Sequence, residues 1–147
     1  MKRTIKKVAV LGSGIMGSRI ACHFAGIGVQ VLLLDIVPED ATENNDKNKR
    51  NKIVNDALQT ALKSNPSPVY DSKVATRITT GNFEDNMKDI AGCDWIIEVV
   101  VERLDIKKLV YEKIEQHRKP GTLITSNTSG IPIYMLAEGR SDDFQKH

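Results

Sequence analysis

A glycine pattern near the amino terminus is the first group of residues whose spacing could bind a ligand. Gly12, Gly14 and Gly17 form G-x-G-x-x-G between the apolar run 8–11, which is typical of a buried strand, and a helical repeat. Gly12 permits a sharp turn, Gly14 lets the backbone approach a diphosphate, and Gly17 lets the helix pack closely on the strand. The free N–H groups of the first helical turn would suit a pyrophosphate.

An acid at the end of the next apolar run strengthens this interpretation. Asp35 closes the run 29–35. A strand before the glycines, a helix after them and an acid ending the following strand are together typical of a dinucleotide site. The Asp35 carboxylate can accept hydrogen bonds from both ribose hydroxyls, and it would repel the 2′-phosphate of NADP. The sequence therefore predicts a site that prefers NAD, with an ordinary strand–turn–helix of an α/β protein as the alternative.

Composition limits the other functions. The 147 residues are 40% apolar, as expected for one folded domain, and the formal net charge of +2 is too small to indicate nucleic acid or a membrane surface as a partner. No run is long enough to cross a bilayer, and the segment after the basic start is broken by glycines and Arg19, so we do not expect export. Cys22 and Cys93 belong to no close Cys/His cluster, which predicts reduced thiols in a cytoplasmic protein and no metal site.

The order of the expected elements predicts the fold. Helical patterns at 14–27 and 104–118, and a short one after Pro132, alternate with expected strands. The expected strands are 7–11, 29–35, 78–80, 95–102 and 122–126. This alternation predicts an α/β fold, a Rossmann-type doubly wound parallel sheet of order 3-2-1-4-5 with right-handed crossovers.

Residues 41–64 are more than a minimal dinucleotide fold needs. The stretch 44–52 is almost wholly polar, and an apolar stripe follows it: Ile53, Val54, Ala57, Leu58, Ala61 and Leu62. We expect one long inserted helix after strand 2, whose first half projects into solvent and whose second half packs. Its basic residues form a solvated face by default. A contact with an acidic ligand or with a second domain is the alternative.

Ligands of doubly wound sheets bind beyond the carboxyl ends of the strands, near the point where the strand order reverses. Here that point lies between the first and fourth strands. The rule places four segments along one rim: residues 12–17, Asp35, Val101 with Glu102, and residues 127–129.

Four segments together resemble a known family. They are residues 11–17, the insertion after Asp35, residues 97–107 (Ile-Glu-Val-Val-Val-Glu-Arg-Leu-Asp-Ile-Lys) and residues 126–130 (Ser-Asn-Thr-Ser-Gly). Over essentially its whole length the chain resembles the NAD-binding domain of the 3-hydroxyacyl-CoA dehydrogenases. The resemblance implies oxidation of the 3-hydroxyl of an acyl-CoA, with hydride passing to NAD in fatty-acid β-oxidation.

The resemblance also implies roles for individual residues. Those implied in cofactor binding are Gly12, Ser13, Gly14, Ile15, Met16, Gly17, Asp35, Val101, Glu102, Lys107 and Ser129. Glu102 and Lys107 would lie near the nicotinamide, and Ser129 with Asn127 would form the catalytic pocket where nicotinamide meets substrate. The inserted helix would help to hold coenzyme A, which draws attention to its cations: Lys47, Lys49, Arg50 and Lys52.

One departure from the family concerns the general base. The family uses a histidine in a His-Phe-Phe-Asn-Pro motif, whereas residues 142–147 resemble the stretch just before it, so we do not assign this role to His147. Glu102 is the nearest candidate, unless it only positions the cofactor. We therefore expect residues 1–147 to be an NAD-binding domain that is catalytically incomplete without the helical domain that completes the substrate pocket and forms the homodimer in the family. The alternatives are a 3-hydroxyacid or ketopantoate-type reductase and a non-catalytic NAD-sensing module.

Overall fold

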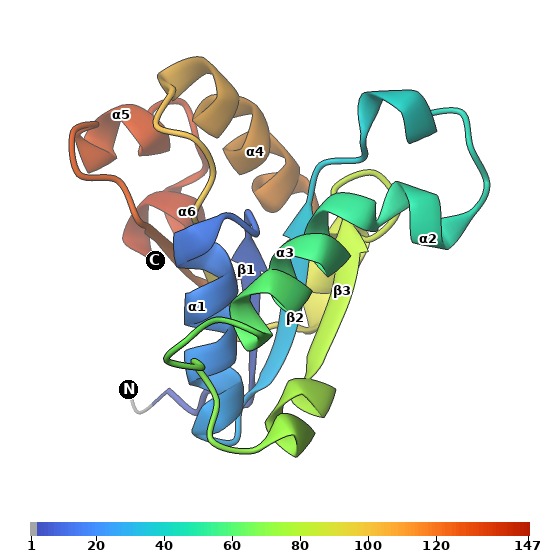
Figure 1. The fold of residues 1–147 in the computed structure, drawn as a ribbon. Helices are drawn as coiled ribbons and strands as arrows, with labels where there is room; N and C mark the ends of the chain where they lie inside the picture. Colours follow the sequence, from blue (N-terminus) through green and yellow to red (C-terminus); the bar gives the residue numbers. More distant parts are fainter. Residues whose placement is uncertain (1–2) are drawn as a thin grey trace.

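A five-stranded parallel sheet forms the centre of the molecule in the computed structural model, which describes residues 3–147 (Figure 1). The strands are β1 (Lys7–Leu11), β2 (Gln30–Asp35), β3 (Ile78–Asn82), β4 (Trp95–Glu98) and β5 (Leu123–Ser126). Their order is β3-β2-β1-β4-β5, and every neighbouring pair is parallel. The predicted sheet order is confirmed.

Helices connect the strands. They are α1 (Ile15–Gly26), α2 (Lys47–Arg50), α3 (Lys52–Leu62), α4 (Leu104–His117), α5 (Ile133–Ala137) and α6 (Asp142–Lys146). Short 3-10 turns lie at Glu39–Ala41, Ser72–Arg77 and Met87–Gly92. Within residues 3–147, no helix combines the length and the apolar character that a membrane crossing requires.

The two faces of the sheet carry separate cores. On β1, Val8 and Val10 pack with α1 and α3, whereas Ala9 and Leu11 pack with α4, α5 and α6. Figure 1 shows α1 and α3 together over one face of the sheet. Because successive side chains of a strand point to opposite faces, a strand covered on both sides is apolar throughout. This explains the continuous apolar runs in the sequence.

The fourth strand is shorter than predicted. It ends at Glu98 rather than at Glu102. The N–H of Val99 still donates to the carbonyl of Leu11 on β1, and the chain then leaves the sheet at Val100 and Val101. The Glu98 carboxylate accepts a hydrogen bond of 2.7 Å from the main-chain N–H of Val100, which turns the chain away from the strand direction. The apolar character of Val101 therefore reflects its position beside a cleft, described below, and not pairing within the sheet.

The single inserted helix is also a wrong prediction. The insertion forms the short α2, a break at Asn51 and then α3, and α2 projects from the sheet at the upper right of Figure 1. Side chains determine where α2 begins: Asn44 accepts from the N–H of Asp46, and Asp46, the N-cap residue, accepts from the N–H of Asn48. The apolar half behaves as predicted, with Val54, Leu58 and Ala61 buried in the core shared with α1.

Candidate functional site

Two glycines of the turn after β1 are required by the chain's own packing. Gly12 has φ +109°, and a Cβ there would lie 2.5 Å from the carbonyl oxygen of Val99. A Cβ on Gly17 would overlap the carbonyl oxygen of Gly12. The N–H of Gly12 donates to the carbonyl of Leu34 at 2.8 Å, which joins the turn to β2. These contacts agree with the sharp turn and the close helix–strand packing that the sequence predicts.

Gly14 differs, because nothing in the protein fills the space beside it. No atom lies within 4 Å of the position that a Cβ would occupy. Gly14 precedes the first turn of α1, which has no side-chain cap, and its carbonyl accepts the N–H of Ser18 at 2.9 Å. The open space and the uncapped N–H groups together fit a diphosphate that approaches the backbone closely.

Two hollows meet at Gly14. The first hollow, of about 660 Å³, is lined by Gly12, Gly14, Asp35, Ile36, Phe83, Val99, Val100, Val101, Ile106, Leu109, Val110, Glu112, Lys113 and Gln116. The second hollow, of about 390 Å³, is lined by Gly14, Ile15, Met16, Gly17, Val99, Val100, Val101, Glu102, Asn127 and Ser129. Because they share Gly14 and the three valines, the hollows form one cleft beyond the carboxyl ends of the strands.

Asp35 lies in the first hollow and is held by the glycine turn. One carboxylate oxygen accepts the main-chain N–H of Ser13 at 2.6 Å and also the Ser13 hydroxyl. The other oxygen accepts the N–H of Ile36 at 2.7 Å. These bonds direct the carboxylate to the place where a ribose would accompany a diphosphate at Gly14.

Glu102 lies at the second hollow and organises the loop after β5. Its carboxylate accepts the Thr128 hydroxyl, the N–H of Ser129 at 3.2 Å and the N–H of Gly130 at 3.0 Å. These hydrogen bonds lower the pKa of Glu102 to about 2, and the bond from Thr128 has the largest effect. A carboxylate with so low a pKa is a weak base near neutral pH, so the geometry favours Glu102 as a positioning residue over Glu102 as the general base.

Lys107 lies behind Glu102 and not in the cleft. Its side chain is 1% exposed, and its Nζ is 2.7 Å from Oε1 of Glu98 and 3.3 Å from Oε2 of Glu102. Sequence reasoning missed Glu98, which ends β4 and is fully buried. The signal was present, because a single acid inside an otherwise apolar strand needs a buried partner.

The structure brings most of the predicted site residues to the cleft. In the second hollow these are Gly14, Ile15, Met16, Gly17, Val101, Glu102, Asn127 and Ser129. Gly12 and Asp35 line the first hollow. Ser13 and Lys107 line neither hollow and act on Asp35 and Glu102 instead. Sequence reasoning also missed Phe83, Leu109 and Lys113, whose apolar or amphipathic positions carry no distinctive signal.

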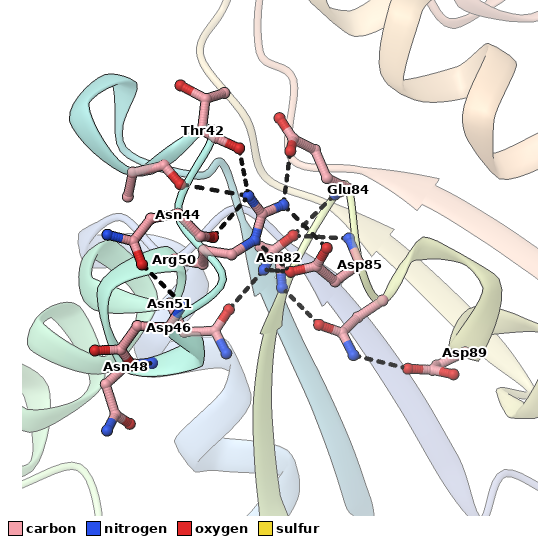
Figure 2. Close-up of polar contacts among 12 residues, drawn as sticks. Thr42, Asn44, Asp46, Asn48, Arg50, Asn51, Asn82, Glu84, Asp85 and Asp89 are labelled. Carbon is pink, nitrogen blue, oxygen red and sulfur yellow. Dashed lines mark hydrogen bonds and ion pairs between the residues drawn. The ribbon is translucent and has the colours of Figure 1, made fainter.

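The cations of the insertion have different environments. The Arg50 side chain is only 12% exposed, and Figure 2 shows its guanidinium between the loop of Thr42 and two acids after β3. It contacts Glu84 at 2.8 Å, Asp85 at 2.7 Å and the carbonyl of Thr42 at 2.6 Å, which raises the pKa of Arg50. Arg50 is therefore engaged within the protein.

The three lysines considered for coenzyme A, Lys47, Lys49 and Lys52, are exposed. Lys52 pairs with Asp56 one helical turn away. Lys47 and Lys49 also face solvent. Two of the four cations considered for coenzyme A are thus in intrachain ion pairs.

Comparison with known proteins identifies the family. Residues 7–145 match the model of the family described as "3-hydroxyacyl-CoA dehydrogenase, NAD binding domain". The chain belongs to this family. NAD is accordingly the cofactor of this domain.

Curated relatives are longer than this chain. It is 47% identical to a probable 3-hydroxyacyl-CoA dehydrogenase of Bacillus subtilis, in a match covering 100% of this chain and 20% of the relative. It is 43% identical to a probable 3-hydroxyacyl-CoA dehydrogenase of Deinococcus radiodurans, covering 97% of this chain and 39% of the relative. The chain thus spans between a fifth and two fifths of these relatives.

Solved structures share the fold. A 3-hydroxybutyryl-CoA dehydrogenase from Escherichia coli is similar with a TM-score of 0.66 and 30% identity, over 95% of this chain and 28% of that one. An (S)-3-hydroxybutyryl-CoA dehydrogenase from Ralstonia eutropha is similar with a TM-score of 0.67 and 26% identity, over 95% of this chain and 47% of that one.

Proposed function

We propose that this chain is the NAD-binding domain of an enzyme that oxidises the 3-hydroxyl of an acyl-CoA in fatty-acid β-oxidation. The observation that supports it is the cleft running from Asp35 to Ser129 across Gly14, the one turn glycine that intrachain contacts do not explain. A family match over residues 7–145 is consistent with this activity.

In this proposal the two hollows hold the two halves of NAD. The N–H groups that begin α1 and the space at Gly14 receive the diphosphate. Asp35 accepts the hydroxyls of the adenosine ribose, and the apolar wall around Phe83 and Leu109 holds the adenine. The nicotinamide then lies in the second hollow beside Ser129, and bound NAD supplies the hydride acceptor.

Ser129 and Asn127 are proposed to contact the substrate alcohol and the nicotinamide. Both line the second hollow, and Glu102 fixes the loop that carries Ser129. This arrangement would hold the alcohol carbon beside the nicotinamide, since orientation of the reacting atoms supplies much of the catalysis in such a transfer.

The general base is proposed to come from outside these residues. An alcohol transfers hydride readily only when a positioned base removes its proton. None of the three histidines in the sequence lines either hollow, and Glu102 is a weak base. We infer that residues 1–147 act with a further domain that supplies the base and completes the acyl-CoA pocket. A homodimer formed through that domain, and a cytoplasmic location, belong to the same proposal.

The test compares cofactor binding with turnover. The 147-residue chain should bind NADH in a fluorescence titration yet show almost no turnover of 3-hydroxybutyryl-CoA, because loss of a general base costs about 10²–10⁴ in rate. A chimera that continues after His147 with the corresponding part of the Deinococcus radiodurans relative should gain activity. Absence of NADH binding, or equal rates for the chain and the chimera, would contradict the proposal.

A further inference from the structure

Glu98 is a fully buried acid on which four hydrogen-bond donors converge. Oε1 accepts Lys107 Nζ at 2.7 Å and the N–H of Val100 at 2.7 Å. Oε2 accepts the Ser126 hydroxyl at 2.5 Å and lies 3.5 Å from the Tyr111 hydroxyl. Donors on every side are the environment of an ionised carboxylate, and no exposed face of Glu98 is available to a ligand.

Glu98 and Lys107 form a buried ion pair. A contribution to folding stability is by itself a weak explanation for this Glu98–Lys107 pair. Burying two charges is costly, and an apolar pair of similar volume is often as stable or more stable. The pair lies directly behind the second hollow, where the nicotinamide half of NAD is proposed to bind. Its location suggests that the charges serve the site.

The Glu98–Lys107 pair affects the net charge at the wall of the second hollow. Lys107 Nζ lies 2.7 Å from Glu98 and 3.3 Å from Glu102, so one cation is shared by two carboxylates. Glu98 and Lys107 are fully buried, whereas the Glu102 side chain is 42% exposed and lines the hollow. Two carboxylates and one ammonium together carry one net negative charge, and Glu102 is the member of the three that lines the hollow.

We propose that Glu98 neutralises Lys107 so that Glu102 presents a net negative charge to the nicotinamide. This inference rests on the proposed function. The oxidised nicotinamide ring carries a positive charge and the reduced ring carries none. Glu98 therefore favours binding of NAD⁺ relative to NADH, although it touches neither.

Glu98→Gln tests this role. The amide keeps a similar shape and still accepts hydrogen bonds, but Lys107 then neutralises Glu102 instead. The ratio of NAD⁺ affinity to NADH affinity should fall about three- to tenfold, as expected for the loss of one charge near the ring. Binding of ADP-ribose, which lacks nicotinamide, should stay unchanged. All three ligands are measured by titration calorimetry.

A double variant separates charge from structure. Glu98→Gln with Lys107→Met removes both buried charges and leaves Glu102 negative, so the NAD⁺ to NADH affinity ratio should return to the wild-type value. A purely structural role predicts equal loss for all ligands and no return. Lys108→Ala is the matched control, because Lys108 neighbours Lys107 on α4 but pairs with Glu138 on the surface.

A third variant avoids the buried pair. Glu102→Gln, on a half-exposed side chain, should lower the same affinity ratio, and an unchanged ratio would overturn the proposal even if Glu98→Gln did not fold. An unchanged affinity ratio in Glu98→Gln would also overturn the proposal. So would a double variant that keeps the lowered ratio or that does not fold. The proposed function fails separately, if the wild-type chain binds neither NADH nor ADP-ribose.

Discussion

The main-chain N–H of Ser13 donates a hydrogen bond of 2.6 Å to the carboxylate of Asp35. This bond ties the glycine turn after β1 to the end of β2, two segments that meet only because their strands are neighbours in the sheet. The same carboxylate lines the hollow proposed for the adenosine ribose. One acid thus orders the glycine turn, and it is the residue proposed to select the cofactor.

Asp35→Ala should weaken NADH binding by about one to two decades, because charge-assisted hydrogen bonds are worth roughly 1.5–3 kcal/mol. The wild-type chain should bind NADH more tightly than NADPH, whose 2′-phosphate would face the carboxylate. Fluorescence titration with both cofactors measures this, with the exposed Asp40→Ala as control. Equal or tighter NADPH binding by the wild type would contradict the prediction and would direct attention to Lys113, which lines the first hollow.

Gly17→Ala should lower stability, whereas Gly14→Ala should weaken NADH binding without affecting the fold. A Cβ on Gly17 overlaps the Gly12 carbonyl, so Gly17→Ala should cost about 3 kcal/mol or more in unfolding free energy. A Cβ on Gly14 meets no protein atom, so Gly14→Ala should fold normally but bind NADH at least about tenfold more weakly. Urea unfolding and NADH titration are measured on both. Normal NADH binding by Gly14→Ala would show that no diphosphate approaches this position.

Glu102 should stabilise the fold in a pH-dependent way. Its pKa is about 2 in the folded chain and 4.5 is its ordinary value, so the carboxylate binds protons more weakly when folded. Its stabilisation is therefore complete above about pH 4.5 and is lost as the pH falls toward 2. The difference in urea midpoint between wild type and Glu102→Gln should be constant from pH 7 to 5 and shrink below pH 4.5. A difference that persists unchanged at pH 3 would contradict the assignment.

Arg50→Met should lower the melting temperature and expose the 41–51 segment to proteolysis, because it removes the bonds to Glu84, Asp85 and the Thr42 carbonyl shown in Figure 2. NADH affinity should be unchanged, since Arg50 lines neither hollow. Lys49→Ala, which replaces an exposed neighbour, is the control and should keep the wild-type melting temperature. An unaltered melting temperature in Arg50→Met would show that these ion pairs contribute nothing measurable.

Lys49→Ala should act on coenzyme A instead of on stability. If the exposed lysines of the insertion meet its phosphates, affinity for acetoacetyl-CoA in the active chimera should fall with rising salt, and Lys49→Ala should weaken it and flatten the salt dependence. Lys63→Ala changes a lysine just after α3 and serves as control. Identical affinity and salt dependence in wild type and Lys49→Ala would assign the lysines to a solvated face.

The pattern of residue types along the sequence determined the strand order and one half of the candidate site, the half formed by the glycine turn and Asp35. Runs of apolar residues separated by helical repeats specify a parallel sheet, and right-handed crossovers leave few possible strand orders. The positions of Gly12, Gly14 and Asp35 then follow, because the carboxyl ends of neighbouring parallel strands share one edge. These inferences use only spacing along the chain and the covalent constraints on strands and turns.

Contacts between distant segments decided the rest. Arg50 is held by acids more than thirty residues away, and helical periodicity does not record contacts of this kind. The sequence indicates Lys107 as a candidate site residue. Only the packing of α4 on β4 shows that its charge is neutralised by the buried Glu98. Electrostatic interactions depend on distance and burial in three dimensions, and neither is a property of sequence order.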